Sequence, residues 1–121
     1  MGTHNMLIDN AQLDQTGPAV RADGYYGYAD GMHTVAFYIK NFKGNLIIEA
    51  SLSDKPQESD WFPIGLGPNG TSFYSVDGPE TRVESFNIVG NFVYLRARIH
   101  RSHLGLNVQQ VGTCERVVLS L

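Results

Sequence analysis

The sequence contains a single cysteine, Cys114, and little charge. One thiol allows no internal disulfide, which excludes the disulfide-stapled scaffolds of small secreted domains and suits folding in a reducing cytoplasm. A lone cysteine near a C-terminal strand is typical of a small buried hydrophobe rather than a nucleophile. Charged residues make up 17% of the chain and the net charge is −3, so no basic field indicates a nucleic-acid partner.

Long apolar runs and helical periodicity are also missing. No run approaches the roughly 20 residues that span a bilayer, and the N-terminal MGTHNMLIDN has no cationic segment followed by an apolar one. We therefore expect neither a membrane anchor nor a signal peptide. No window of helical length places its apolar side chains at i, i+3, i+4 and i+7, which argues against a helical architecture.

The chain shows period-two alternation instead, interrupted by glycine-rich turns. Alternate side chains are apolar in residues 33–42 and again in residues 46–53, and the Gly44 region between them resembles a hairpin turn. These two segments are expected to form an antiparallel pair with one buried face. Further strands are expected at residues 61–64, 71–76, 82–88, 92–99, 106–111 and 116–121, with a turn at 77–80.

About eight strands separated by turns predict an all-β fold, a two-sheet antiparallel β-sandwich that is jelly-roll-like. The 121 residues fit one domain, and a chain of this size can bury a core without a disulfide or a metal. Residues 1–121 are interpreted as a single β-sandwich domain. Within it, residues 1–30 form an irregular N-terminal arm and an aromatic loop.

Catalytic motifs are missing or lie in the wrong context. Residues 65–70, GLGPNG, fit the G-x-G-x-x-G pattern but lead into a strand-like segment, so a glycine-rich turn is favoured over a nucleotide site. Asn69 starts a glycosylation-acceptor pattern, for which an Asn-Gly turn is favoured. No nucleophile-elbow, zinc-protease or Walker motif is present. We expect no enzyme activity, no catalytic residue and no cofactor.

Two groups of side chains carry metal-ligating chemistry. His100 and His103 are three residues apart, which on a strand puts their rings on opposite faces, with no acidic or thiol partner beside them. Asp54, Glu58 and Asp60 share one loop but lack the calcium-loop pattern. We expect the acidic loop to be solvated and the histidines to belong to a basic patch with Arg96 and Arg98, so no metal site is predicted.

Aromatic side chains supply the candidate binding residues. The 6 Tyr, 6 Phe and 1 Trp are too many for so small a core, and rings on sandwich loops stack on sugars or anchor protein interfaces. Tyr94, Arg96 and Arg98 share one face of a strand, which suits a subunit contact, plain solvated surface or, less well with an acidic chain, nucleic acid. The candidates for protein or glycan contact are Tyr25, Tyr26, Tyr28, Trp61, Phe62, Tyr94, Arg96 and Arg98.

Four segments resemble small β-sandwich structural proteins of tailed bacteriophages, of the T4-like cyanophage type. They are D-G-x-H-T-V-A-F at 30–37, F-x-G-N-L at 42–46, L-S-x-x-P-x-x-x-D-W-F at 52–62 and G-N-F-V-Y-L-R-A at 90–97. The resemblance covers residues 24–121. It implies a non-enzymatic virion protein of the capsid decoration, neck, tail, baseplate or fibre, folded in the host cytoplasm. Such a protein acts in many copies, as a homo-oligomer or multicopy assembly, through contacts with other virion proteins and without nucleic acid or membrane.

A looser resemblance, to galactose-binding or discoidin-type jelly rolls, covers about half of the chain. It rests on W-F-x-I at 61–64 and V-Y-L-R at 93–96. This second resemblance implies an alternative function, a carbohydrate-binding β-sandwich module that aids host attachment. No ligand residue is matched by it, so it assigns no role to any side chain.

Overall fold

The computed structural model describes residues 3–27, 31–66 and 73–120, and most of these residues lie in β-strands. The strands are β1 (Thr3–Asn5), β2 (Gln15–Thr16), β3 (Val20–Arg21), β4 (Met32–Ser51), β5 (Phe62–Pro63), β6 (Tyr74–Val89), β7 (Tyr94–His100) and β8 (Thr113–Ser120). The helical elements are α1 (Asp23–Tyr26) and the 3₁₀ turns Glu58–Asp60, Ser102–Leu104 and Val108–Gln110. None of the helices in the described ranges is long and apolar enough to cross a membrane.

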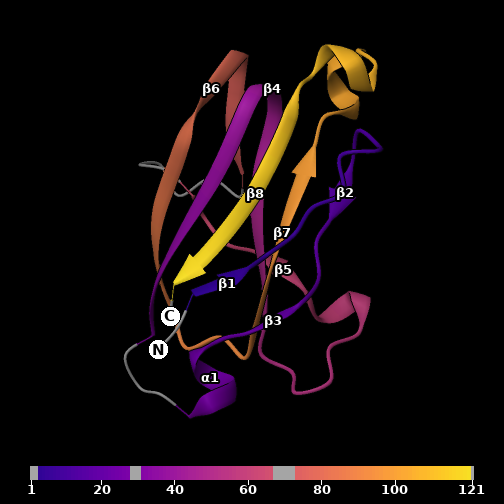
Figure 1. Cartoon of the computed structure of the whole chain (residues 1–121). Helices are drawn as coiled ribbons and strands as arrows, with labels where there is room; N and C mark the ends of the chain where they lie inside the picture. Colours follow the sequence, from indigo (N-terminus) through magenta and orange to yellow (C-terminus); the bar gives the residue numbers. More distant parts are fainter. Residues whose placement is uncertain (1–2, 28–30, 67–72, 121) are drawn as a thin grey trace.

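Strands β4 and β6 run through both layers of the molecule. They pair antiparallel from Met32 opposite Val89 to Leu46 opposite Tyr74, with shifts of register between residues 39 and 44. Both strands fold over at the top of the molecule, so that each contributes one arm to each layer (Figure 1). Asn41 at this bend has a φ of 51° and Gly44 a φ of 134°, values that glycine adopts without a steric penalty.

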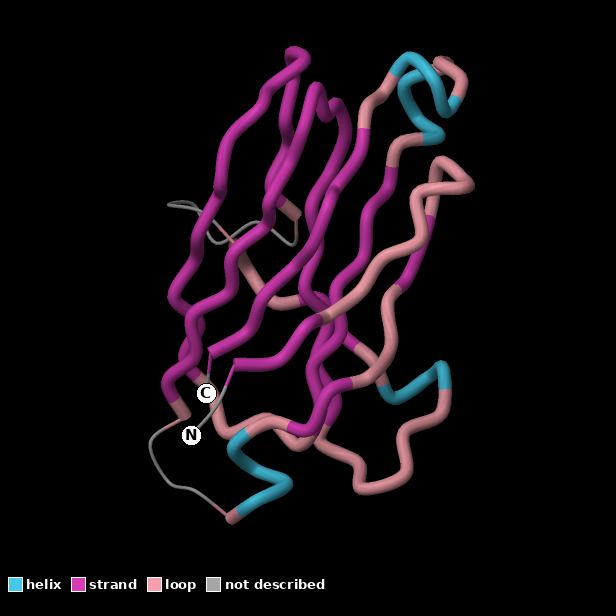
Figure 2. The backbone as a smooth tube through the Cα atoms, in the orientation of Figure 1, coloured by secondary structure: helices cyan, strands magenta, loops and turns pink. Residues whose placement is uncertain are grey.

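The molecule is therefore a hydrogen-bonded sheet folded over on itself into two layers (Figure 2). One layer holds the first arm of β4 with β8 and β1 on one side and the second arm of β6 on the other. The second layer holds the other arm of β4, flanked by β7 and then by β2 and β3, with β5 and the start of β6 at the opposite edge. The predicted all-β antiparallel sandwich of about eight strands is confirmed.

The core lies between the layers and is built from alternate residues of the long strands. The predicted inward faces of residues 33–42, 46–53 and 92–99 are confirmed except at their ends, because Leu52 is 64% exposed and Val93 is only half-buried. Core side chains of these three segments are Val35, Phe37, Ile39, Leu46, Ile48, Ala50, Leu95, Ala97 and Ile99. Cys114 is also buried, as predicted, and burial raises the pKa of its thiol to about 12, which makes it a poor nucleophile.

Three expected elements differ from the structure. Residues 33–42 and 46–53 do not pair with each other, because they are the two arms of β4 and lie in opposite layers. The turn expected at 77–80 lies inside β6, which bends together with β4. The strand expected at 106–111 is replaced by a 3₁₀ turn, in which the side chains of Asn107 and Gln110 cap each other's backbone.

Gly112 and Gly105 give a direct test of how tightly the chain packs beside the bend. Their φ angles are nearly equal, 66° and 70°, but a Cβ at Gly112 would overlap the carbonyl oxygen of Asn41, whereas a Cβ at Gly105 meets nothing. Gly105→Ala is expected to lower the free energy of unfolding by about 1 to 2 kcal/mol through its left-handed backbone alone. Gly112→Ala is expected to lower the free energy of unfolding by about 1 to 3 kcal/mol more than Gly105→Ala does, because the added methyl group overpacks the site.

Urea unfolding followed by circular dichroism measures both losses. Gly105→Ala is the matched control, because it imposes the same backbone conformation without the clash. Equal losses in the two variants would contradict the packing of Gly112 against Asn41.

Candidate functional site

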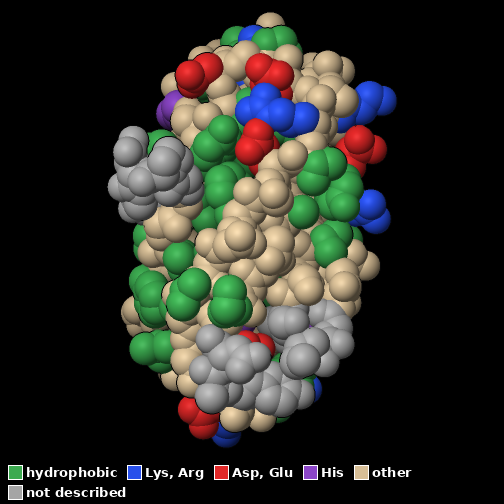
Figure 3. All heavy atoms as spheres, turned by 90° about the vertical axis from the view of Figure 1, so that its left-hand side faces the viewer, with side chains coloured by type: hydrophobic (Ala, Val, Ile, Leu, Met, Phe, Trp, Pro, Cys, Tyr) green, Lys and Arg blue, Asp and Glu red, His purple; other side chains and the backbone are tan. Residues whose placement is uncertain are grey.

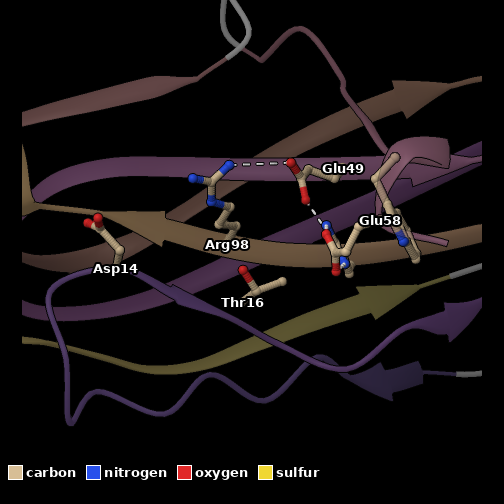
Figure 4. Close-up of a pocket in the computed structure, with 7 residues that line it drawn as sticks. Asp14, Thr16, Glu49, Glu58 and Arg98 are labelled. Carbon is tan, nitrogen blue, oxygen red and sulfur yellow. Dashed lines mark hydrogen bonds and ion pairs between the residues drawn. The ribbon is translucent and has the colours of Figure 1, made fainter.

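The outer face of the β4–β7 layer carries a pocket of about 340 Å³. Seven side chains from the sheet and its flanking segments converge on it (Figure 4): Asp14, Thr16, Glu49, Glu58, Trp61, Arg96 and Arg98. Glu49 of β4 lies directly opposite Arg96 of β7 in the register, and opposite residues of an antiparallel pair project from the same face. Strand alternation adds Arg98 to that face, and pairing of β2 with β7 places Thr16 beside it.

Arg96 is the centre of the site. Its Nε donates to Oε1 of Glu49 at 2.7 Å, and its two terminal nitrogens donate to the two carboxylate oxygens of Glu58 at 3.2 Å each. Its guanidinium also lies 4.2 Å from the centre of the Trp61 ring. Because the planar Arg96 guanidinium is bonded to two carboxylates and stacked on an aromatic ring, its side chain has little conformational freedom. Arg96 therefore ties the loop that carries Glu58 and Trp61 to the sheet.

The ion pairs of Arg96 with Glu49 and Glu58 stabilise the charged forms of Arg96 and Glu58. Burial acts to lower the pKa of Arg96, but the bonds to Glu58 and Glu49 outweigh it, and the pKa is raised. The hydrogen bonds from Arg96 hold the pKa of Glu58 below its ordinary value. Glu49 is only 7% exposed, and its second oxygen accepts a 3.4 Å bond from Arg98. Two guanidinium groups thus compensate one buried carboxylate.

Arg98 and Thr16 provide the hydrogen-bonding groups that remain open to a ligand. The Arg98 side chain is 38% exposed, and among the residues that the structure describes its long bond to Glu49 leaves most of its five N–H groups without a partner. In Figure 4 it lies between Glu49 on one side and Asp14 on the other, with Thr16 close by. The Glu58 side chain is 87% exposed, so its carboxylate is also within reach of solvent.

Asp14, at the far end of the pocket, is a fixed anion. Its carboxylate accepts bonds from the backbone of Arg101 at 2.9 Å, the backbone of Ser102 at 3.1 Å and the Ser102 hydroxyl at 2.8 Å. Burial acts to raise the pKa of Asp14, but these bonds and the nearby His100 outweigh it, so the pKa is lowered. This carboxylate shapes the pocket and is not poised to take up a proton.

The expectation about His100 and His103 is wrong in two respects. An acidic side chain does lie beside them, because Nδ1 of His100 is 3.1 Å from Oδ1 of Asp14, and the two rings are not on opposite faces. The rings stack 5.0 Å apart with an angle of 8° between the planes, because β7 ends at His100 and the turn Ser102–Leu104 brings the second ring back over the first. The residues that the structure describes contain no group of three or more His, Cys, Asp or Glu side chains suited to a metal ion. Asp60, from the acidic loop, caps the backbone of Gln57.

The predicted binding residues fall into three places. Trp61, Arg96 and Arg98 line the pocket. Tyr25, Tyr26 and Tyr94 form a neighbouring group that includes Arg21, which we name the tyrosine cluster: its ring centres are 5.4 Å apart for Tyr25 and Tyr26 and 5.7 Å for Tyr25 and Tyr94. Phe62 packs instead against Phe92, at 6.2 Å. Tyr28 and Asn69 lie outside the described residues, as do the last four residues of the GLGPNG segment.

Sequence reasoning missed the residues that hold the pocket together. Glu49 could have been predicted as a site residue, because it is a lone charge between apolar residues in the interior of a strand. Glu58 was noted only as part of an acidic loop, and its pairing with Arg96 depends on how that loop folds back. Asp14 and Thr16 come from the irregular N-terminal arm, where no periodicity marks an orientation.

No protein-family model and no curated protein matches the chain. Among solved structures, it is similar to CBM29_1, a family 29 carbohydrate-binding module from Piromyces equi, with 9% identity and a TM-score of 0.46 over 99% of this chain and 81% of that one. It is also similar to the K1 cleaved adhesin domain of Lys-gingipain from Porphyromonas gingivalis W83, with 13% identity and a TM-score of 0.35. That match covers 88% of this chain and 59% of the other. At these scores the likenesses assign no family.

Proposed function

We propose that this chain is a non-catalytic carbohydrate-binding module whose ligand occupies the pocket beside Trp61. The observation that carries the proposal is the convergence of an indole ring, guanidinium groups and carboxylates in one hollow of the sheet face. A sugar offers an apolar ring face together with hydroxyls that both donate and accept, which is the complement of such a lining. A volume of about 340 Å³ also suits a small organic ligand.

The rigidity of the pocket favours binding. Arg96 holds Trp61 and Glu58 in place, so these side chains lose little freedom when a ligand arrives. Arg98, Thr16 and the exposed carboxylate of Glu58 line the same pocket, so donors and acceptors are both offered to a ligand. Neighbouring hydroxyls of a sugar ring can engage donors and acceptors of this kind together.

The electrostatics of the pocket favour binding over hydrolysis. Glycosidases generally need one carboxylic acid with a raised pKa to protonate the leaving oxygen. Here the pKa values of Asp14 and Glu58 are lowered, and Glu49 is held between two guanidinium groups. Asp14 and Glu58 are therefore suited to stay ionised, which supports a ligand-holding role.

Trp61→Ala is expected to weaken glycan binding about 10- to 100-fold, the size of an interface hot spot. The indole supplies apolar area to the pocket and anchors Arg96, so both contributions disappear together. A glycan array with the protein displayed in many copies identifies the ligand, and isothermal titration calorimetry then measures the loss.

Tyr38→Ala is the matched control. Tyr38 carries a stacked arginine, Arg116, at 4.0 Å, much as Trp61 carries Arg96, but it lies on the first arm of β4, away from the pocket. An array with no signal, or equal losses from both substitutions, would count against glycan binding at this pocket.

We also propose that the chain is a component of a tailed-phage virion, in which the pocket aids host attachment. The phage resemblance suggests this role, and an apolar outer surface supports it. Met32, Val83 and Val89 are exposed, and Met32 and Val89 lie opposite each other on β4 and β6. Apolar side chains gather on the β6 side of the molecule (Figure 3), which suits contacts multiplied over many copies. Absence of the protein from purified particles in mass spectrometry would exclude this role.

A further inference from the structure

We infer that the ligand is an extended, uncharged glycan chain that runs along β7 from the pocket to the tyrosine cluster. The inference rests on the proposed function and adds to it a second contact site and a ligand class. It starts from the fact that Tyr94, a member of the tyrosine cluster, lies on the same face of β7 as the pocket residues Arg96 and Arg98. A terminal sugar in the pocket alone would leave the tyrosine cluster without a role.

The geometry of β7 aligns the two sites. Tyr94, Arg96 and Arg98 alternate along the strand and are each half-buried, while the residues between them are fully buried. Alternate strand residues are about 7 Å apart, so the line from Tyr94 to Arg98 is about 13 Å long. Trp61 stacks at the middle of this line, on Arg96. A ligand that contacts Arg98 and Tyr94 together, about 13 Å apart along the strand, therefore needs more than one sugar ring.

The tyrosine cluster is exposed but firmly held. Arg21 of β3 lies opposite Tyr94 in the register, and its guanidinium is 4.5 Å from the centre of the Tyr25 ring. The following turn is hydrogen-bonded to the segment before β7, through Ala22 to Val93 at 2.8 Å and Gly24 to Phe92 at 2.7 Å.

Tyr25 and Tyr26 are nevertheless exposed large side chains. Gly24 makes the close approach possible, because a Cβ there would lie 2.6 Å from the Phe92 carbonyl oxygen. Exposed rings on an anchored backbone form a preorganised contact surface, so ligand binding costs little conformational entropy there.

The charges of the pocket select against an acidic chain. Three carboxylates, Asp14, Glu49 and Glu58, face two guanidinium groups, and both terminal nitrogens of Arg96 are already engaged by Glu58. A uronic or sialic acid would add a negative charge beside these carboxylates, at a cost in a partly desolvated site. Uncharged sugars present only hydroxyls and apolar ring faces, so they fit the pocket and the tyrosine cluster alike.

The experiment measures the affinity of the folded chain for a neutral oligosaccharide series, from the monosaccharide to the hexasaccharide, of the sugar found on the array. We expect a rise of about 10-fold or more with length, which then levels off when the tyrosine cluster is reached. Tyr25→Ala is expected to flatten this length dependence, whereas Trp61→Ala lowers the affinity at every length. Tyr25→Phe retains the ring and is expected to retain the length dependence, which separates a lost contact from a damaged fold.

The possible outcomes separate the two proposals. No binding at any length contradicts the proposed function itself. Equal affinity for the monosaccharide and the hexasaccharide, or a length dependence that survives Tyr25→Ala, overturns the extended-chain inference and leaves pocket binding intact. A uronic-acid oligosaccharide that binds as tightly as the neutral one overturns the assignment of an uncharged ligand.

Discussion

Arg101→Met is expected to lower the free energy of unfolding by about 3 to 5 kcal/mol, because it leaves three backbone carbonyls without their donor at about 1 to 3 kcal/mol each. Arg101 is 0% exposed and is among the largest fully buried side chains. It donates to the carbonyl oxygens of Leu13 at 3.2 Å, Gln12 at 3.0 Å and Gly112 at 2.7 Å. Without the guanidinium these acceptors lose their donor, and methionine restores only the apolar volume.

The position of Arg101 explains why the loss is large. Its acceptors belong to the N-terminal arm and to the segment before β8, two irregular stretches that make few strand hydrogen bonds of their own. Its guanidinium also lies 5.5 Å from the centre of the Phe42 ring at the bend of β4. One side chain thus joins three parts of the fold, and its backbone N–H fixes Asp14 at the pocket.

Urea unfolding of the variant measures the effect, with Arg116→Met as the control. Arg116 is exposed and stacks on Tyr38 at 4.0 Å, so its replacement is expected to cost no more than about 1 kcal/mol. Arg101→Lys keeps the charge but not the planar fork, and is expected to lose most of the same stability. A lysine variant as stable as the wild type would show that charge, rather than the directed bonds, explains the role of Arg101.

The contrast between Arg101 and Arg96 shows what the sequence can predict. Alternation predicts the outward direction of Arg96, because β7 buries one face and leaves the other open. Arg101 follows directly after the strand, so alternation no longer applies to it, and composition alone favours an exposed arginine. Its burial depends on the N-terminal arm and the segment before β8 closing around it, which are contacts between residues far apart in the sequence.

The bend of β4 was mispredicted for a related reason. The glycine at position 44 between two alternating runs is typical of a hairpin, in which the runs pair with each other. Here β6 bends alongside β4 and supplies the partner for both arms. The hydrophobic alternation of each arm of β4 predicts which of its faces is buried. It does not predict the strand with which the arm pairs, because a distant and a nearby partner strand produce the same alternation.

Arg96→Met is expected to reduce stability and glycan affinity together. Among the residues that the structure describes, it leaves the buried Glu49 with only the 3.4 Å bond from Arg98, and an incompletely paired buried carboxylate is expected to cost about 2 to 4 kcal/mol. It also removes the hydrogen bonds that hold Glu58 and the stacking that holds Trp61. We expect glycan affinity to fall by at least about 10-fold, because the pocket must then be ordered by the ligand.

A second substitution separates these two effects. Glu49→Gln removes the buried charge, so the Arg96→Met/Glu49→Gln double variant is expected to regain part of the stability that Arg96→Met loses. It does not restore the contacts of Arg96 with Trp61 and Glu58, so the affinity is expected to stay low. Urea unfolding and isothermal titration calorimetry on the wild type, both single variants and the double variant complete the cycle. A double variant no more stable than Arg96→Met would show that Glu49 needs no partner, whereas recovered affinity would show that Arg96 does not position the pocket.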